Sequence, residues 1–148
     1  MKISVQKEDF DLNREVSLLR KDQSVGAIAS FIGQVREVAM TLEHYPGMTE
    51  KALEKIVDEA KQRWKVMDVL VVHRVGELKP ADQIVLVVVT GAHRGEAFAA
   101  CESIMDYLKT QAPFWKKEQT PGGSRWVEAR SSDDEAAQRW EPPKSSAA

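Results

Sequence analysis

Residues Thr90–Glu118 have the sequence TGAHRGEAFAACESIMDYLKTQAPFWKKE. Apolar side chains recur in it at intervals of three and four positions, which predicts an amphipathic helix of about four turns. The helix is expected to end near Thr110, because Pro113 disfavours helical backbone at the residue before it. A short extended segment, Phe114–Gln119, follows the turn. The predicted apolar stripe consists of Ala97, Phe98, Cys101, Ile104, Met105 and Leu108.

Cationic residues stand at both ends of this predicted helix. His93 and Arg94 precede it, Lys109 lies near its end, and Lys116 follows the turn. His93 and Lys109 are sixteen positions apart, which is about 24 Å along a helix axis. These two side chains cannot meet around one small molecule within one chain, whereas Lys109 and Lys116 can. If all four serve one site, His93 and Arg94 must come from a second copy, so the sequence predicts a composite site at a dimer interface.

The bulk composition predicts a single domain without a membrane span. The chain has 148 residues, enough to bury a hydrophobic core, and a formal net charge of −2. A near-neutral charge argues against a nucleic-acid-binding protein. The longest apolar run, Ile84–Val89, is far shorter than the ~20 residues that a membrane span needs. The N-terminus also lacks the apolar core of a signal peptide, so we expect a cytoplasmic protein.

The cysteine and histidine content predicts no metal site, and we separately expect no bound cofactor. Cys101 is the single cysteine in the sequence, and its place on the apolar stripe favours a buried small side chain over a reactive thiol. His44, His73 and His93 show no metal-ligand spacing. We expect a structural role for the pair His73-Arg74, at the end of a strand far from the cations described above.

The whole pattern predicts an α+β domain over residues 1–140, with a mixed, mainly antiparallel sheet and about three helices. Two nearly continuous apolar strands are expected to be covered on both faces, and Gly26 and Gly33 suggest a bulge or a close backbone approach in another strand. Thr49 is expected to cap a helix. Residues 141–148 are expected to form a disordered tail. The predicted strands are 2–6, 24–35, 38–45, 67–75, 83–90, 114–119 and 124–130, and the other helices begin at Asp9, at Thr49 and, for a short one, at Asp133.

Seven short strings in the chain occur in one order: FIGQVR (Phe31–Arg36), LEHYPGMTEKAL (Leu42–Leu53), HRVGEL (His73–Leu78), AHR (Ala92–Arg94), MDYLKT (Met105–Thr110), APFWKKE (Ala112–Glu118) and RWVEAR (Arg125–Arg130). Any one of them would be weak evidence. Together they cover most of the chain between Phe31 and Trp140, and in this order the chain resembles the family of large, catalytic subunits of molybdopterin synthase.

The resemblance implies an α/β-hammerhead-like fold and a sulfurtransferase activity. Enzymes of this family convert cyclic pyranopterin monophosphate into molybdopterin, the precursor of the molybdenum cofactor, by installing two sulfurs as a dithiolene. The sulfur arrives as a thiocarboxylate on the C-terminal tail of a small ubiquitin-like sulfur-carrier subunit. The family assembly is a heterotetramer around a homodimer of the large subunit, which agrees with the composite site predicted from helix length.

The resemblance also implies roles for individual residues. Lys109 matches the essential lysine of the family and Lys116 matches a second one, and Lys109 must lose its proton to act as a nucleophile or as a base. His93 and Arg94 lie at a helix start, where free N–H groups suit the cyclic phosphate of the substrate. The simpler alternatives are lysines that are solvated surface charges and a His-Arg pair that faces solvent.

Further candidates for substrate binding come from the same strings. Arg36 follows Gln34 and Val35, and its planar guanidinium suits a phosphate or a pterin. The family commonly has a lysine at position 34 and a longer loop after Arg36 than residues 37–41 provide. Phe31 and Met105 line either the substrate pocket or the core. The remaining candidates are Lys117 and Glu118, beside Lys116, and Arg130, which would come from the other protomer.

A second hypothesis belongs to a different class. The chain could be a non-catalytic module that binds a ubiquitin-like tail or a phosphorylated pterin without turnover. The retention of Lys109 and Lys116 favours the enzyme, and the short loop after Arg36 favours the binding module.

Overall fold

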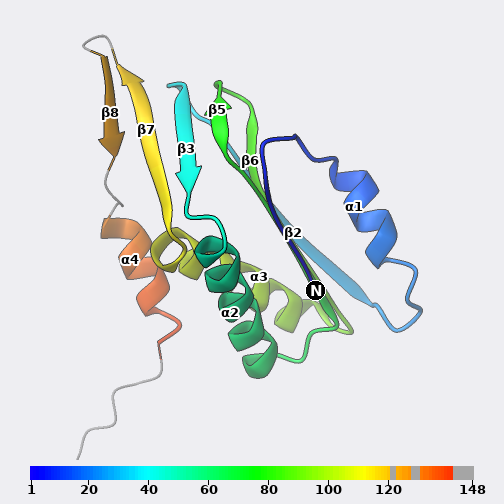
Figure 1. The fold of residues 1–148 in the computed structure, drawn as a ribbon. Coiled ribbons are helices and arrows are strands. Elements are labelled where there is room, and N and C mark those ends of the chain that lie inside the picture. The colour runs from blue at the N-terminus through cyan, green and yellow to red at the C-terminus, as the bar shows by residue number, and fades with distance from the viewer. Residues whose placement is uncertain (121–122, 128–130, 142–148) are drawn as a thin grey trace, which may run out of the picture.

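The computed structural model describes residues 1–120, 123–127 and 131–141, and these form two four-stranded sheets (Figure 1). In the first sheet β1 runs parallel to β4 and the other pairs are antiparallel. The second sheet is antiparallel throughout. The predicted mixed, mainly antiparallel α+β fold is therefore confirmed, with the strands divided between two sheets. In sheet order, the first contains β1 (Lys2–Gln6), β4 (Asp68–Arg74), β6 (Gln83–Gly91) and β2 (Ala27–Gln34), and the second β5 (Gly76–Leu78), β3 (Met40–His44), β7 (Phe114–Thr120) and β8 (Gly123–Val127).

Four helices accompany the sheets in the described part of the chain. Helices α2 and α3 lie together against one face of the first sheet, α1 lies on the opposite face, and α4 packs beside α3 (Figure 1). The long helix predicted from the Thr90–Glu118 pattern is present as α3, and Pro113 follows its end as expected. The helices are α1 (Leu12–Leu19), α2 (Met48–Arg63), α3 (Arg94–Gln111) and α4 (Ser131–Gln138).

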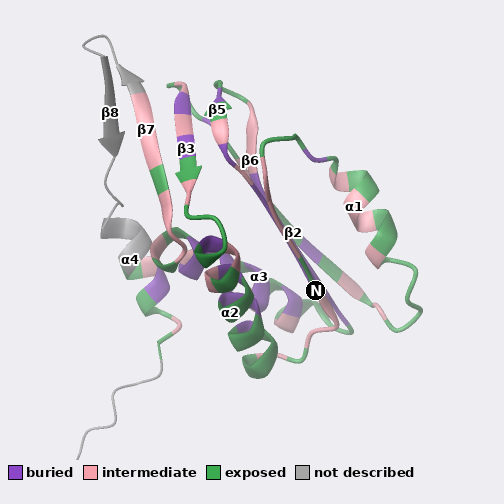
Figure 2. Ribbon diagram, viewed as in Figure 1, coloured by how far each residue is buried: buried purple, intermediate pink, exposed green. Residues whose placement is uncertain are grey.

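The two central strands of the first sheet are buried on both faces, as their apolar runs predict. Successive side chains of a strand point to opposite faces. Val69 and Val71 of β4 accordingly pack with α2 and α3, while Leu70 and Val72 pack with Phe10 and α1. Figure 2 shows buried residues along β6 and on parts of α2 and α3. The sheet is thus a rigid layer that fixes the position of α3.

The start of α2 differs from the prediction. Gly47, with φ of 87°, precedes the first helical residue, so Thr49 lies inside the helix and is not its N-cap. The Thr49 hydroxyl is fully buried, accepts a hydrogen bond from the Tyr45 N–H at 2.9 Å and donates one to the Pro113 carbonyl at 2.9 Å. Thr49 therefore joins the beginning of α2 to the turn that follows α3.

Both glycines of the predicted strand have the expected roles. A Cβ atom on Gly26 would lie 2.3 Å from the carbonyl oxygen of Ala92, so the backbone approaches too closely for a side chain. At Gly33 the pairing of β2 with β6 shifts register, which is a β-bulge. The close approach at Gly26 places the start of α3 against the beginning of β2.

Two predictions fall outside the described residues: the contact made by Arg130, and the disorder of residues 142–148 in the expected tail. In the part of the chain that the structure describes, none of the helices combines the length and the apolar character that crossing a membrane requires.

Candidate active site

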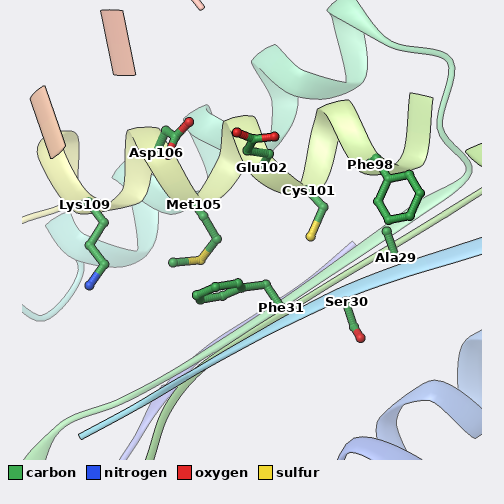
Figure 3. A pocket seen from close by; sticks show the side chains of 9 residues that line it. All are labelled: Ala29, Ser30, Phe31, Phe98, Cys101, Glu102, Met105, Asp106 and Lys109. Carbon is green, nitrogen blue, oxygen red and sulfur yellow. The ribbon is translucent and has the colours of Figure 1, made fainter. Parts of the chain in front are cut away.

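An open groove of about 430 Å³ lies between α3 and the edge strand β2 (Figure 3). In Figure 3, Cys101, Met105 and Lys109 point from α3 toward β2, whereas the carboxylates of Glu102 and Asp106 point away from it. The groove has an apolar floor with one cation at its end, an arrangement suited to a flat ring with an anionic substituent. It is lined by Ala29, Ser30 and Phe31 from β2 and by Phe98, Cys101, Glu102, Met105, Asp106 and Lys109 from α3.

The exposure of the groove residues differs along its length. Met105 is buried, with 7% of its surface exposed, whereas Phe31 is 43% exposed and Phe98 is 64% exposed. Phe98 therefore does not belong to the buried stripe in which the periodicity places it. The two phenylalanines leave an apolar surface open along β2 and α3.

The cations of α3 stand at opposite ends of the helix, as the sequence predicts. His93 is the N-cap residue, Arg94 is the first helical residue, and both are exposed. Lys109 lies in the last turn. The sixteen positions between His93 and Lys109 correspond to about 24 Å, so a molecule held in the groove at Lys109 does not reach His93 of the same chain.

The second lysine of interest lies on β7, the strand that follows α3. Lys116 is partly buried and forms an ion pair with Glu118 at 3.2 Å. In the ladder between β3 and β7, Leu42 pairs with Lys116 and Met40 pairs with Glu118. Lys117, which lies between them, pairs with Thr41. The strand thus alternates its charged residues, so that Lys116 and Glu118 share one face and Lys117 occupies the other.

His73 lies closer to the candidate site than the sequence predicts. Its ring stacks on Phe114 with 3.8 Å between centroids and 18° between planes, and its Nδ1–H donates to the Arg74 carbonyl at 2.9 Å. Burial lowers the pKa of His73 to about 4; the hydrogen bond to Arg74 acts in the opposite direction, and the charges of Lys109 and His44 lower the pKa further. The prediction that His73 lies far from the cations of α3 is wrong, because its buried ring stacks on Phe114 and lies within electrostatic range of Lys109.

The candidates at the end of β2 occupy three different environments. Val35 is buried, its N–H donates to the Asp82 carbonyl at 2.9 Å and its carbonyl accepts from the Ala81 N–H at 2.8 Å. Gln34 is exposed and donates through Nε2 to the Ala81 carbonyl at 3.1 Å. Arg36 is exposed, and the short link beyond it begins with Glu37 at φ of 68°. Arg36 and Gln34 are thus both exposed, and Arg36 is the cation among the three.

The thiol of Cys101 in the groove is a poor nucleophile at neutral pH. Burial raises the pKa of Cys101 to about 11, with a further rise from the charge of Glu102, so the thiol stays protonated at neutral pH and is a poor nucleophile. The described residues hold no group of three or more His, Cys, Asp or Glu side chains that could bind a metal ion.

Four residues that line the groove or lie near Lys109 were not predicted as site residues from the sequence. Glu102 and Asp106 carried a signal, because they lie seven and three positions before Lys109 and helical spacing brings such positions together. Phe98 was selected as a core residue. His73 gave no local signal, since strand pairing and the stacking on Phe114 bring it near Lys109 from 36 positions away.

The comparisons with known proteins identify the family. A sequence model of the family described as MoaE protein matches residues 5–111. The molybdopterin synthase catalytic subunit of Ralstonia nicotianae is 62% identical over 93% of this chain and 83% of its own length. The chain belongs to the MoaE family.

Solved structures agree with this assignment. The molybdopterin biosynthesis MoaE protein from Burkholderia ambifaria is 62% identical, with a TM-score of 0.84 over 95% of this chain and 98% of its own. A structure from Helicobacter pylori, a protein–protein complex of subunits 1 and 2 of molybdopterin-converting factor, shares the fold with a TM-score of 0.72 at 20% identity, over 86% of this chain and 91% of its own. The MoaE family is therefore supported by sequence and by fold over nearly the whole chain, and the chain is an enzyme of the molybdopterin synthase catalytic-subunit type.

Proposed function

We propose that this MoaE-family chain converts cyclic pyranopterin monophosphate into molybdopterin, with sulfur from the C-terminal thiocarboxylate of a small ubiquitin-like partner. The observation that carries the proposal is the groove between α3 and β2, which joins an apolar floor to Lys109. A pterin ring fits between Phe31 and Met105, because aromatic and thioether side chains bind flat rings well. Lys109 at the end of the groove supplies the amine that acts as a nucleophile or a base.

Sulfur delivery by a partner suits the other groups in the groove. Cys101 is buried and protonated, so the chain does not present a reactive thiol of its own at this site. The relatives at high identity are called catalytic subunits, which implies a second kind of chain in the enzyme. We propose that this chain is the small sulfur carrier, that the reaction requires no resident cofactor, and that it takes place in the cytoplasm.

The test is a turnover assay with the purified chain, the thiocarboxylated small subunit and cyclic pyranopterin monophosphate. Wild type is expected to form dithiolene product. Lys109→Ala is expected to lose it while still binding the small subunit. Lys55→Ala, which removes an exposed lysine of α2, is the matched control and should keep full activity. Tight binding of the small subunit by wild type without any product would instead identify a binding module.

We further propose that two copies of the chain pair along the apolar surface formed by Phe31 and Phe98. These exposed residues lie on an edge strand and on α3, and an exposed apolar patch of this kind is typical of an interface. A two-fold pairing with antiparallel α3 helices would bring His93 and Arg94 of one copy to Lys109 of the other. The anion site and the lysine would then meet around one substrate, which a single chain does not achieve.

Subunit mixing tests this arrangement. Lys109→Ala and His93→Ala/Arg94→Ala are each expected to be inactive alone. After the two variants are unfolded and refolded together, half of the dimers would be mixed and each would contain one intact site, so activity should recover to about a quarter of wild type. Failure to recover any activity in verified mixed dimers would contradict the shared site while leaving the proposed reaction open to the first assay.

A further inference from the structure

The C-terminal helix ends in a clamp on the outer side of α3, formed by Arg139 and Trp140. Nη2 of Arg139 donates to Oε1 of Glu102 and to Oδ2 of Asp106, each at 2.8 Å. The indole Nε1–H of Trp140 donates to the same Oδ2 of Asp106 at 2.7 Å. Two carboxylates on consecutive turns of α3 thus share one guanidinium, and one of them also receives the indole N–H.

The clamp has anchors besides Arg139. The Trp140 ring meets Trp64 of α2 edge-to-face, with 5.3 Å between centroids, and Nη1 of Arg63 donates to the Trp140 carbonyl. Trp140 also packs against the main core cluster. The end of α4 is therefore held on the domain even if the guanidinium is removed.

The carboxylates held by the clamp lie on the same helix as Lys109. Asp106 precedes Lys109 by three positions, a spacing at which an acidic and a basic side chain can pair on a helix surface. In the structure they diverge, since Asp106 points away from the groove and Lys109 points toward β2 (Figure 3). The half-buried Asp106 is bonded to Arg139 and Trp140, just beyond the end of α4.

We propose that Arg139 is a positioning residue for Lys109: it holds and neutralises Asp106 and Glu102, so that these carboxylates do not turn toward the Lys109 amine and stabilise its protonated form. The proposal rests on the proposed function in one respect, the need for an unprotonated Lys109. It concerns where Asp106 and Glu102 point and does not depend on the other contacts that Lys109 makes.

The other titratable groups around α3 do not stabilise a protonated Lys109, because they are neutral or cationic or act on other groups. From β4, the neutral His73 lies within range of Lys109, and β7 contributes the cationic Lys116. The residues of β2 that line the groove carry no charge. On α2, Glu59 and Arg63 act on Tyr107, and Glu141 beyond α4 acts on the same group. Among these described groups, Asp106 and Glu102 are the anions that line the groove. Their hydrogen bonds and charges raise the pKa of Arg139, and the hydrogen bond to Asp106 is the largest cause.

The test is the titration of Lys109 in the full-length protein, measured without substrate by competitive acetylation and peptide mass spectrometry. Arg139→Gln removes the cation but keeps a side chain of similar reach. Its Lys109 midpoint is expected to rise by about one pH unit, the shift typical of a new carboxylate within 4–6 Å. Turnover below the midpoint should fall up to about tenfold in kcat with little change in KM. Arg139→Lys, which keeps the charge, should restore most of the loss.

The rescue variant decides between an electrostatic and a merely structural role. Arg139→Gln/Asp106→Asn removes the released carboxylate nearer to Lys109 in the sequence but keeps an acceptor for Trp140. Most of the shift in the Lys109 midpoint should therefore be reversed, and only the contribution of Glu102, seven positions from Lys109, should remain. Lys2→Ala is the matched control. It breaks an exposed ion pair to Glu15 whose two side chains are 54% and 14% exposed, close to the 55% and 16% of Arg139 and Asp106. It should leave the midpoint unchanged.

Two results would overturn the proposal: an unchanged Lys109 midpoint in folded Arg139→Gln, or a raised midpoint that Asp106→Asn does not correct. Because acetylation requires no turnover, a midpoint that shifts and recovers as expected supports the clamp even if the protein shows no synthase activity. In that case the proposed function alone is refuted. If Arg139→Gln does not fold, Arg139→Met gives the same decision, since it also removes the cation while keeping an extended side chain, and its Lys109 midpoint should rise in the same way.

Discussion

Replacing Thr49 with valine should destabilise the protein through the loss of two part-buried hydrogen bonds. Valine has nearly the shape of threonine, so packing is preserved while the hydroxyl is lost. The Tyr45 N–H would lose its acceptor and the Pro113 carbonyl its donor, both now at 2.9 Å. Leaving a buried partner unsatisfied costs about 1–3 kcal/mol. Since the Thr49 side chain is fully buried, we expect the free energy of unfolding to fall by about 2–4 kcal/mol.

The assay is urea unfolding followed by circular dichroism at fixed protein concentration, because association would make stability depend on concentration. The same change should lower Tm by roughly 5–12 °C for a domain of this size. Thr110→Val is the matched control. Its hydroxyl makes only long bonds, at 3.4 Å, to two carbonyls of its own helix, so its loss should cost less than about 0.5 kcal/mol.

Equal and small effects of the two substitutions would refute the reasoning. That outcome would show that water satisfies the Tyr45 and Pro113 groups once the hydroxyl is absent. It would also show that the Thr49 hydroxyl is not needed to hold the start of α2 against the turn after α3.

Three further predictions concern His73, Gly26 and Cys101. His73 has a pKa of about 4 in the folded protein against an ordinary 6.5, so the unfolded state binds its proton first. The free energy of unfolding should fall by up to about 3 kcal/mol from pH 6.5 to pH 4, and His73→Asn, compared by urea titrations, should lose that dependence. Gly26→Ala should lower the free energy of unfolding by about 1–3 kcal/mol in the same titrations, because its Cβ would meet the Ala92 carbonyl oxygen at 2.3 Å. Gly95→Ala is the comparison: position 95 has open space around it, so this change should stabilise α3 by up to about 1 kcal/mol. Cys101, with its pKa raised to about 11, should react with a thiol-specific disulfide reagent at pH 8 only after denaturation.

The features that the sequence predicts well are those with local causes. The apolar period of α3 and the backbone restriction imposed by Pro113 determine that helix and its end. The continuous apolar runs of β4 and β6 specify strands buried on both faces. The glycine at position 26 marks a close approach that any side chain would prevent. Each of these is decided within a few residues, which is why it is visible without a structure.

The features that were missed depend on long-range contacts. The three residues of β5 are too few to show a period, and their strand exists because Met40, Thr41 and Leu42 of β3 pair with them. Thr49 resembles an N-cap by residue type, but its hydroxyl is used by Pro113, 64 positions away. For the same reason the division into two sheets and the approach of His73 to Phe114 could not be predicted from local pattern.

The candidate site has a similar explanation. One rigid helix fixes the separation of its two cationic ends, because eighteen residues of α3 cannot bend enough to bring His93 to Lys109. That separation follows from sequence alone and requires a second copy if one substrate uses both ends. The proposed control of the Lys109 charge state, in contrast, uses Asp106 and Arg139, the residue that follows α4, and these are brought together only by folding. The chemistry at one end of α3 is therefore set by two contacts outside the helix, one within the chain and one across the proposed dimer.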